Sequence, residues 1–171
     1  LNPMSSTIFM TGSTGCVGRY VVDAILEFTT HDLDLLVRNL AKVPAAWKTN
    51  PRVRILHDDL LAIKNRADNI RKADYIIHLA TDWGGNPEIN DRAASFLFDQ
   101  ADPARVKKIV YFSTASVLDE KSDLSEIAGT YGPPYVRTKY HFQKKLRTLA
   151  LYDRTITLYL TSLIGGNDTI P

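Results

Sequence analysis

A tyrosine and a lysine stand four residues apart in the segment YVRTK at 135–139. The apolar positions of 135–151 predict a helix, which would place Tyr135 and Lys139 on one face. A free tyrosine has a pKa of about 10, and a nearby cation lowers this value by favouring the phenolate. The pair is therefore suited to give a proton to a carbonyl oxygen or to remove one from an alcohol.

A third candidate, Thr114, follows the apolar segment 106–112 in the hydroxyl-rich run STAS at 113–116. Its hydroxyl can hydrogen-bond the same substrate oxygen as Tyr135. Alone, a tyrosine and a lysine at this spacing are most often a solvated pair on a helix surface. The catalytic interpretation depends on the other motifs of the chain.

A glycine-rich segment, TGSTGCVG at 11–18, lies between an apolar run at 7–10 and an amphipathic segment at 17–28. This order predicts a strand, a tight turn and a helix. Gly12 allows the turn, Gly15 lets a pyrophosphate lie against the backbone, and Gly18 lets helix and strand pack closely. The helix N-terminus would then face the phosphates. The segment predicts a dinucleotide site, with a purely structural turn as the alternative.

The residue after the apolar segment 33–37 indicates which dinucleotide is bound. NAD-binding folds usually carry an acidic residue here for the ribose 2′-hydroxyl, whereas this chain has Arg38. A guanidinium can pair with the 2′-phosphate of NADP, and Lys42 can assist. We therefore expect NADP(H) to be preferred over NAD(H). In the alternative, Arg38 is a solvated loop residue and Asp34 or Asp32 reaches the ribose.

Strand-like and helix-like segments alternate along the chain. Strands are expected at 7–10, 33–37, 53–56, 75–80, 106–112 and 155–160, and helices at 17–28, 41–48, 60–72, 89–100 and 135–151. The segment 121–134 is expected to be a loop. This alternation predicts an α/β fold with a doubly wound parallel sheet (Rossmann fold) in the strand order 3-2-1-4-5-6. His78, at the end of the fourth strand, is interpreted as a hydrogen-bonded core residue.

Composition limits the class of protein further. A length of 171 residues favours one domain, and a net charge of +2 does not indicate a nucleic-acid or membrane partner. The single cysteine, Cys16, excludes an intrachain disulfide and a multi-cysteine metal site, so we expect no metal and a cytoplasmic setting. No apolar run approaches the ~20 residues that span a bilayer, and no signal-peptide pattern is present.

Together these motifs resemble the short-chain dehydrogenase/reductase superfamily, in its extended branch of NAD(P)-dependent epimerase/dehydratase proteins. The matching segments, in family order, are TGSTGCVG (11–18), HDDL (57–60), DYIIHLA (74–80), YFSTASV (111–117), YVRTK (135–139) and LTSLIGG (160–166). They cover nearly the whole chain and do not specify a substrate. The resemblance implies an NAD(P)-dependent enzyme that couples proton transfer to hydride transfer on a carbonyl or secondary alcohol, with a nucleotide sugar as one candidate.

The resemblance also implies roles for individual residues. Tyr135 would be the acid/base, Thr114 the accompanying catalytic hydroxyl, and Lys139 the residue that holds the nicotinamide ribose and lowers the tyrosine pKa. The residues implied to bind the cofactor are Gly12, Thr14, Gly15, Cys16, Val17, Gly18, Arg38, Asp59, Leu60, Leu79, Ala80, Thr81, Asn90, Ser162 and Leu163. Asp59 and Leu60 would lie beside the adenine, and Ser162 and Leu163 near the nicotinamide.

Extended members of this superfamily continue for well over a hundred residues past the position of Pro171, into a substrate domain. We therefore expect 1–171 to be the NAD(P)-binding domain without its substrate domain, either as a fragment or as a natural short form. The expected partners are a small-molecule substrate and a second copy of the chain, paired through helices 89–100 and 135–151. Core packing of those two helices is the alternative. A non-catalytic NADP(H)-binding module or sensor is the alternative function.

Overall fold

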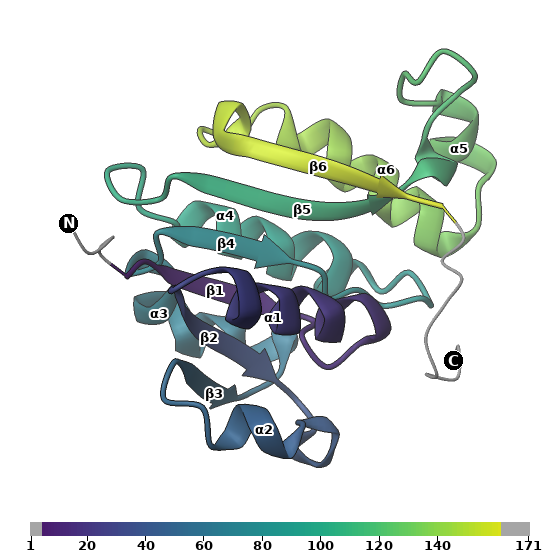
Figure 1. Ribbon diagram of the computed structural model, residues 1–171. Helices are drawn as coiled ribbons and strands as arrows, with labels where there is room; N and C mark the ends of the chain where they lie inside the picture. The colour runs from purple at the N-terminus through teal and green to yellow at the C-terminus, as the bar shows by residue number, and fades with distance from the viewer. Residues whose placement is uncertain (1–4, 162–171) are drawn as a thin grey trace.

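The computed structural model describes residues 5–161, which form a six-stranded sheet between two layers of helices (Figure 1). Its strand order is β3-β2-β1-β4-β5-β6 and all neighbouring strands are parallel, which confirms the predicted doubly wound sheet. The strands are β1 (Thr7–Thr11), β2 (Asp32–Val37), β3 (Val53–His57), β4 (Tyr75–His78), β5 (Lys108–Thr114) and β6 (Thr155–Leu160).

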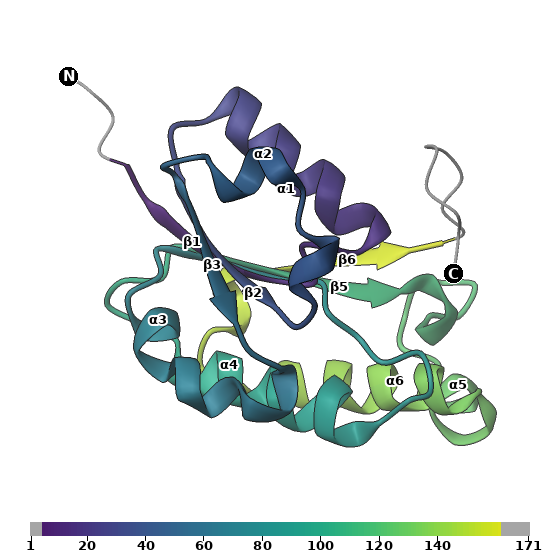
Figure 2. The ribbon, with the colours of Figure 1, turned by 90° about the horizontal axis from the view of Figure 1, so that it is seen from below.

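The helices lie on both faces of the sheet (Figure 2). On one face are α1 (Cys16–Phe28) and α2 (Ala45–Lys48), and on the other are α3 (Ala67–Arg71), α4 (Ala94–Gln100) and α6 (Pro134–Leu146). The short helix α5 (Glu126–Tyr131) packs against α6. This arrangement leaves the carboxyl ends of the strands at one edge, where ligands bind in open α/β sheets.

The central strands are buried on both faces, as their continuous apolar sequences indicate. Phe9 of β1 packs into the core under α3, α4 and α6, while its neighbour Met10 packs into the core under α1. The edge strand β6 differs. Thr157 faces α6 and accepts a hydrogen bond from Gln143, but Ile156 and Leu158 on the α1 face remain 47% and 40% exposed. Among the described residues, the helix layer on the α1 side therefore does not extend over β6.

The segment 121–134 is not entirely a loop, because α5 lies within it. The Ser125 hydroxyl accepts a hydrogen bond from the Ala128 N–H and so caps this helix. The glycines and prolines of the segment obscured this capping signal. The helix is short, and its contact with α6 stabilises it more than its own propensity does.

Several predicted boundaries were wrong by a few residues. The segment 60–72 is a 3₁₀ helix at Leu60–Arg66 followed by α3, and the segment 89–100 begins with a π-helical turn at Glu88–Ala93 before α4. Helix α6 ends at Leu146, and β4 ends at His78. β5 extends to Thr114, so the candidate hydroxyl is the last residue of the strand.

The apolar positions of the two helices expected at a dimer interface lie in the core. Leu97 and Phe98 of α4 and Phe142 and Leu146 of α6 belong to one buried cluster. The exposed positions of these helices are largely charged, and they include Arg92, Asp99, Arg137, His141 and Lys144. The alternative of core packing accounts for the apolar pattern, and the homodimer stays a prediction.

No helix within residues 5–161 is long and apolar enough to cross a membrane. Over the same residues, no group of histidine, cysteine or acidic side chains is arranged to hold a metal ion.

Candidate cofactor-binding and catalytic site

Two glycines of the turn after β1 are required by close packing. Gly12 has a φ of +78°, and a Cβ there would lie 2.6 Å from the backbone nitrogen of Ala80. A Cβ at Gly18 would lie 2.1 Å from the Gly12 carbonyl oxygen. These contacts bring α1 and the segment after β4 against the turn, as the roles predicted for Gly12 and Gly18 require.

The third glycine has a different environment. Gly15 is exposed, its φ is −77°, and a Cβ there would meet only the Gly12 carbonyl oxygen, at 3.3 Å. The fold itself therefore does not require glycine at this position. Among the described residues, no other non-neighbouring atom lies within 4 Å of such a Cβ, which fits a pyrophosphate that lies against the backbone.

The start of α1 fits an anionic ligand. Its N-cap residue, Gly15, has no side chain to cap the helix, and its first turn contains no acidic residue. The Ser13 hydroxyl is buried in the turn and has no hydrogen-bond partner among residues 5–161. Free N–H groups, the positive end of the helix dipole and this unpartnered hydroxyl all match the needs of a dinucleotide phosphate.

Thr11 and His78 form a buried pair beneath the glycine turn. The Thr11 Oγ1 lies 2.7 Å from His78 Nδ1 and accepts a hydrogen bond from the Ala80 N–H at 3.3 Å. Burial, together with the positive charge of Lys139, lowers the pKa of His78 to about 3, so the imidazole is neutral near pH 7. The interpretation of His78 as a hydrogen-bonded core residue is confirmed.

Replacing Thr11 with valine is expected to lower the free energy of unfolding by about 1–3 kcal/mol, because it leaves the Ala80 N–H and His78 Nδ1 without this partner. Thr11→Ser keeps the hydroxyl and is expected to lose only about 1 kcal/mol, from the missing methyl group. Urea unfolding of both variants checks the ranking. A valine variant at least as stable as the serine variant would contradict it.

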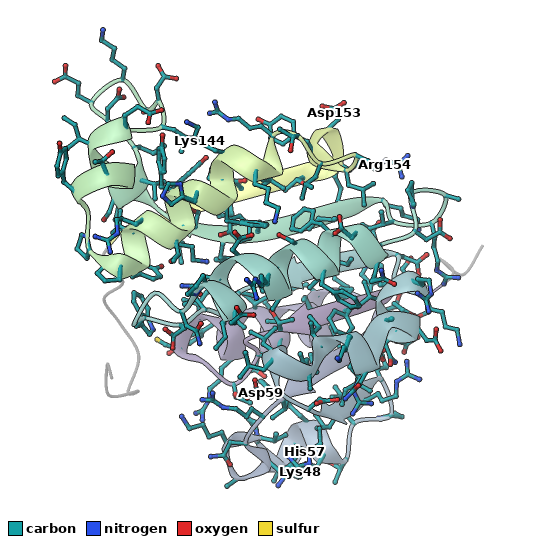
Figure 3. All side chains as sticks on the ribbon, turned by 180° about the vertical axis from the view of Figure 1, so that it is seen from behind. Lys48, His57, Asp59, Lys144, Asp153 and Arg154 are labelled. Carbon is teal, nitrogen blue, oxygen red and sulfur yellow. The ribbon has the colours of Figure 1, made fainter. Side chains whose placement is uncertain are left out.

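Arg38 and Asp59 lie together after β2 and β3. Their nearest charged atoms are 3.7 Å apart, and the Arg38 side chain is 78% exposed. Asp59 lies two residues after His57, the last residue of β3, so it stands with Arg38 at the carboxyl ends of the strands (Figure 3). An exposed pair at this distance contributes little free energy, so the guanidinium remains available to a phosphate.

The two aspartates considered as alternatives for the ribose are engaged elsewhere. Asp34 is buried in the middle of β2, where it accepts hydrogen bonds from Arg54 and Asn69. Asp32 begins β2, at the opposite edge from the glycine turn, and accepts a hydrogen bond from the Ser5 hydroxyl. Neither carboxylate lies at the carboxyl end of the strand.

The catalytic candidates converge where β5 meets α6. Lys139 is buried, and its Nζ donates a hydrogen bond to the Phe112 carbonyl, two residues before Thr114. Tyr135 is half-buried against the cluster that contains Val117, three residues after Thr114. Strand β5 and helix α6 thus bring Thr114, Tyr135 and Lys139 to the edge that carries the glycine turn.

The pKa of Tyr135, which stands four residues before Lys139, differs from the expectation. Burial raises the pKa of Tyr135, whereas the sequence predicted a lowered value. Burial also lowers the pKa of Lys139 to about 7, and its Nζ is bonded to a backbone carbonyl. The predicted lowering of the tyrosine pKa is therefore not found, because burial disfavours the charged phenolate.

Asn90 connects the segment after β4 to α6. Its Oδ1 accepts hydrogen bonds from the Thr81 hydroxyl and the Asp82 N–H, and its Nδ2 donates to the Asp82 carbonyl and to Thr138 Oγ1. The Thr138 hydroxyl in turn donates to the Tyr135 carbonyl. Both ends of the Asn90 amide are therefore engaged within the protein, and they fix the position of the helical turn that carries Tyr135.

The remaining predicted residues divide into three groups. Thr14, Cys16 and Val17 lie in the glycine turn and the first turn of α1, partly exposed. Leu60 and Leu79 pack against the two main core clusters, and Ala80 contacts Gly12. Ser162 and Leu163 lie outside the described residues.

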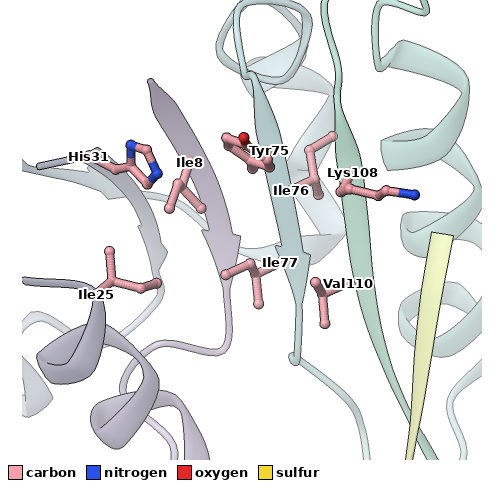
Figure 4. A pocket seen from close by; sticks show the side chains of 8 residues that line it. All are labelled: Ile8, Ile25, His31, Tyr75, Ile76, Ile77, Lys108 and Val110. Carbon is pink, nitrogen blue, oxygen red and sulfur yellow. The ribbon is translucent and has the colours of Figure 1, made fainter. Parts of the chain in front are cut away.

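A cavity of about 160 Å³ lies away from this site, on the α1 face of the sheet (Figure 4). Its lining includes Ile25 of α1 and the first residues of β4 and β5, Tyr75 and Lys108. It therefore opens toward the amino ends of the strands. In a doubly wound sheet, this is not the edge where ligands bind.

Four residues of the site region were not expected from the sequence. Thr11, Ser13, Thr138 and Trp83 all contact predicted site residues or line the glycine turn. Thr11 and Ser13 stand inside the glycine motif, so their position was a usable signal. The contact between Trp83 and Tyr135 joins the loop after β4 to helix α6, and no local sequence pattern connects these two segments.

Comparison with known proteins agrees with this geometry. A family described as NAD(P)H-binding matches residues 12–156. Among curated proteins, none matches the chain by sequence. The enzyme WbmG from Bordetella bronchiseptica, solved with NAD, has a TM-score of 0.79 and 17% identity, over 100% of this chain and 58% of that protein.

Two further solved structures share the fold. The terminal R domain from the myxalamid biosynthetic pathway has a TM-score of 0.72 and 19% identity, over 93% of this chain and 50% of that one. DesIV, a dTDP-glucose 4,6-dehydratase from Streptomyces venezuelae solved with NAD, has a TM-score of 0.67 and 23% identity, over 82% of this chain and 50% of that one. The chain thus spans between half and three-fifths of the length of these proteins.

The family match covers the glycine turn, the end of β2, and the β5–α6 region that carries the catalytic candidates. The predictions of an NAD(P)-binding family and of a Rossmann fold are thereby confirmed. The chain belongs to the NAD(P)H-binding family.

Proposed function

We propose that the chain binds NADP(H) and supports oxidation or reduction of a carbonyl or secondary alcohol, as in an oxidoreductase, epimerase or dehydratase. The observation that supports the proposal is that β5 and α6 carry Thr114, Tyr135 and Lys139 at the edge of the sheet where the glycine turn lies. When bound, the nicotinamide would supply or accept the hydride.

Each residue has a distinct part in this proposal. The Tyr135 hydroxyl gives a proton to the substrate oxygen or removes one, and the Thr114 hydroxyl hydrogen-bonds the same oxygen. Lys139, whose pKa is about 7, can hydrogen-bond a ribose hydroxyl as ammonium or amine. The turn at Gly12, Gly15 and the uncapped start of α1 holds the pyrophosphate.

A nucleotide sugar is the proposed substrate. The support comes from the likeness in fold to DesIV, named as a dTDP-glucose 4,6-dehydratase, and to WbmG, also solved with UDP. Because the chain spans about half the length of these proteins, we also propose that residues 1–171 form the cofactor-binding part of a longer enzyme.

The preference for NADP(H) is proposed from Arg38. Its exposed guanidinium lies at the end of β2, and neither Asp32 nor Asp34 is placed to bind a ribose there. Calorimetric titration of the wild-type chain with NADPH and NADH tests this proposal. We expect tighter binding of NADPH.

Arg38→Ala is expected to weaken NADPH binding by about 10- to 100-fold, as the loss of a charge-assisted hydrogen bond would. It should leave NADH binding nearly unchanged, since NADH has no 2′-phosphate. Lys48→Ala, which removes an exposed cation of α2, is the matched control. An equal loss for both cofactors in Arg38→Ala would mean that Arg38 supports the fold rather than the phosphate.

A non-catalytic NADP(H)-binding module is the second candidate. The raised pKa of Tyr135 favours this candidate, because it opposes formation of the phenolate that would act as the base. It predicts binding of NADPH without turnover of any carbonyl or alcohol substrate.

A further inference from the structure

Trp83 is an exposed aromatic residue held next to the proposed catalytic tyrosine. Its ring centroid lies 4.7 Å from that of Tyr135, with an angle of 35° between the planes, yet its side chain is 70% exposed. Large aromatic side chains are usually buried or at a contact surface. The second tryptophan follows this rule, because Trp47 is 2% exposed and donates a hydrogen bond to Asp23.

The loop fixes Trp83 from both sides. Before it, the Asp82 N–H and carbonyl are bonded to Asn90. After it, the Gly85 N–H donates to the Asp82 carbonyl, and the Asn86 N–H donates to Asp82 Oδ2. The exposure of the indole is therefore a property of an ordered turn.

The same turn is held against the helix that carries Tyr135. Gly85 has a φ of +79°, and a Cβ there would lie 2.3 Å from the Pro134 carbonyl carbon and 2.6 Å from the Tyr135 nitrogen. The loop and the start of α6 are thus in backbone contact. The Trp83 indole therefore lies beside the ring of Tyr135 on a fixed backbone.

The surroundings of the indole indicate what it binds. One neighbour of its ring is the Tyr135 ring, and the loop residues on either side of it, Asp82, Gly84, Gly85 and Asn86, carry no apolar side chain. A hexopyranose has the complementary surface, with apolar C–H groups on its faces and hydroxyls around its rim. Extended apolar chains need apolar neighbours along their length, which this loop does not offer.

We propose that Trp83 is a substrate-binding residue whose indole face stacks against the C–H face of a hexopyranose ring at Tyr135. This assignment deepens the proposed function and rests on it for the identity of Tyr135 as the reacting group. It also gives the loop after β4 a role in selecting ring-shaped over acyclic alcohols.

Fluorescence quenching tests the stacking directly, because buried Trp47 is shielded and acrylamide reports mainly on Trp83. The probe is methyl β-D-glucopyranoside, with the acyclic six-carbon polyol sorbitol as the control. Saturating glucoside is expected to lower the quenching constant about twofold, as covering one ring face would. Sorbitol is expected to leave it unchanged. Equal quenching with and without the glucoside would overturn the assignment.

Saturation-transfer NMR measures binding of the same glucoside to variants of Trp83. Its ring C–H signals should persist in Trp83→Phe, which keeps an aromatic face, and fall at least about fivefold in Trp83→Ala. Tyr152→Ala is the matched control, since Tyr152 is also exposed but precedes β6 at the opposite edge. Unchanged signals in Trp83→Ala would overturn the proposal.

Titration of the same samples with NADPH separates the two proposals. NADPH binding without protection of Trp83 would leave the cofactor proposal standing and refute the sugar site. Protection of Trp83 without NADPH binding would leave the sugar site standing and refute the cofactor proposal.

Discussion

Tyr135→Phe is expected to lower kcat by about 10²- to 10⁴-fold, the usual contribution of a positioned acid or base. The phenyl ring keeps the contact with Trp83 and the packing against the Val117 cluster, so only the hydroxyl is lost. NADPH affinity should stay within about threefold, since the cofactor is held by other groups. Steady-state turnover and calorimetry on the same preparation measure both quantities.

Tyr159→Phe is the matched control for this variant. Tyr159 packs in the same cluster and burial also raises its pKa, but it lies on β6. Unchanged turnover in Tyr135→Phe would end the assignment of Tyr135 as the acid or base. A fall in turnover with equal loss of NADPH binding would instead show that the hydroxyl supports the cofactor.

Gly15→Ala is expected to weaken NADPH binding by about 10- to 100-fold while changing the free energy of unfolding by less than about 1 kcal/mol. The reason is geometric: the new methyl group would lie in front of the backbone, and its nearest non-neighbouring atom among residues 5–161 would be the Gly12 carbonyl oxygen at 3.3 Å. The φ of −77° is accessible to alanine.

Gly18→Ala is the contrasting variant, because its methyl group would lie 2.1 Å from the Gly12 carbonyl oxygen. It is expected to lose about 3 kcal/mol or more of stability, since backbone atoms must move. Thermal unfolding and NADPH titration of both variants check the contrast. If Gly15→Ala kept full NADPH affinity, the pyrophosphate could not lie against Gly15.

The sheet could be predicted from the sequence because the strands are short apolar runs, separated by turn residues or by segments with helical spacing. The glycine turn after β1 and the buried pattern of β2 are local features, and handedness rules then determine the strand order. The boundaries were less predictable. Helix α6 ends at Leu146 although apolar residues continue to Leu151, because those residues turn back into the core.

The site could be predicted only as a set of residues at one edge. The pattern at 135–139 indicated a tyrosine and a lysine on one helical face, but not that Lys139 would donate to the Phe112 carbonyl. That bond, and the burial that raises the pKa of Tyr135, depend on how β5 meets α6. The Asn90 network depends likewise on contacts between segments 48 residues apart.

The central position of β1 has a consequence for the growing chain during synthesis. β1 pairs with β2 on one edge, but its other edge is closed only by β4, which ends at His78. Until that segment leaves the ribosome, β1 presents an open edge to other strands. The turn at Gly12 also lacks its contact with Ala80 until then. A nascent chain shorter than about 80 residues is thus both prone to misassociation and unable to be rescued by its cofactor.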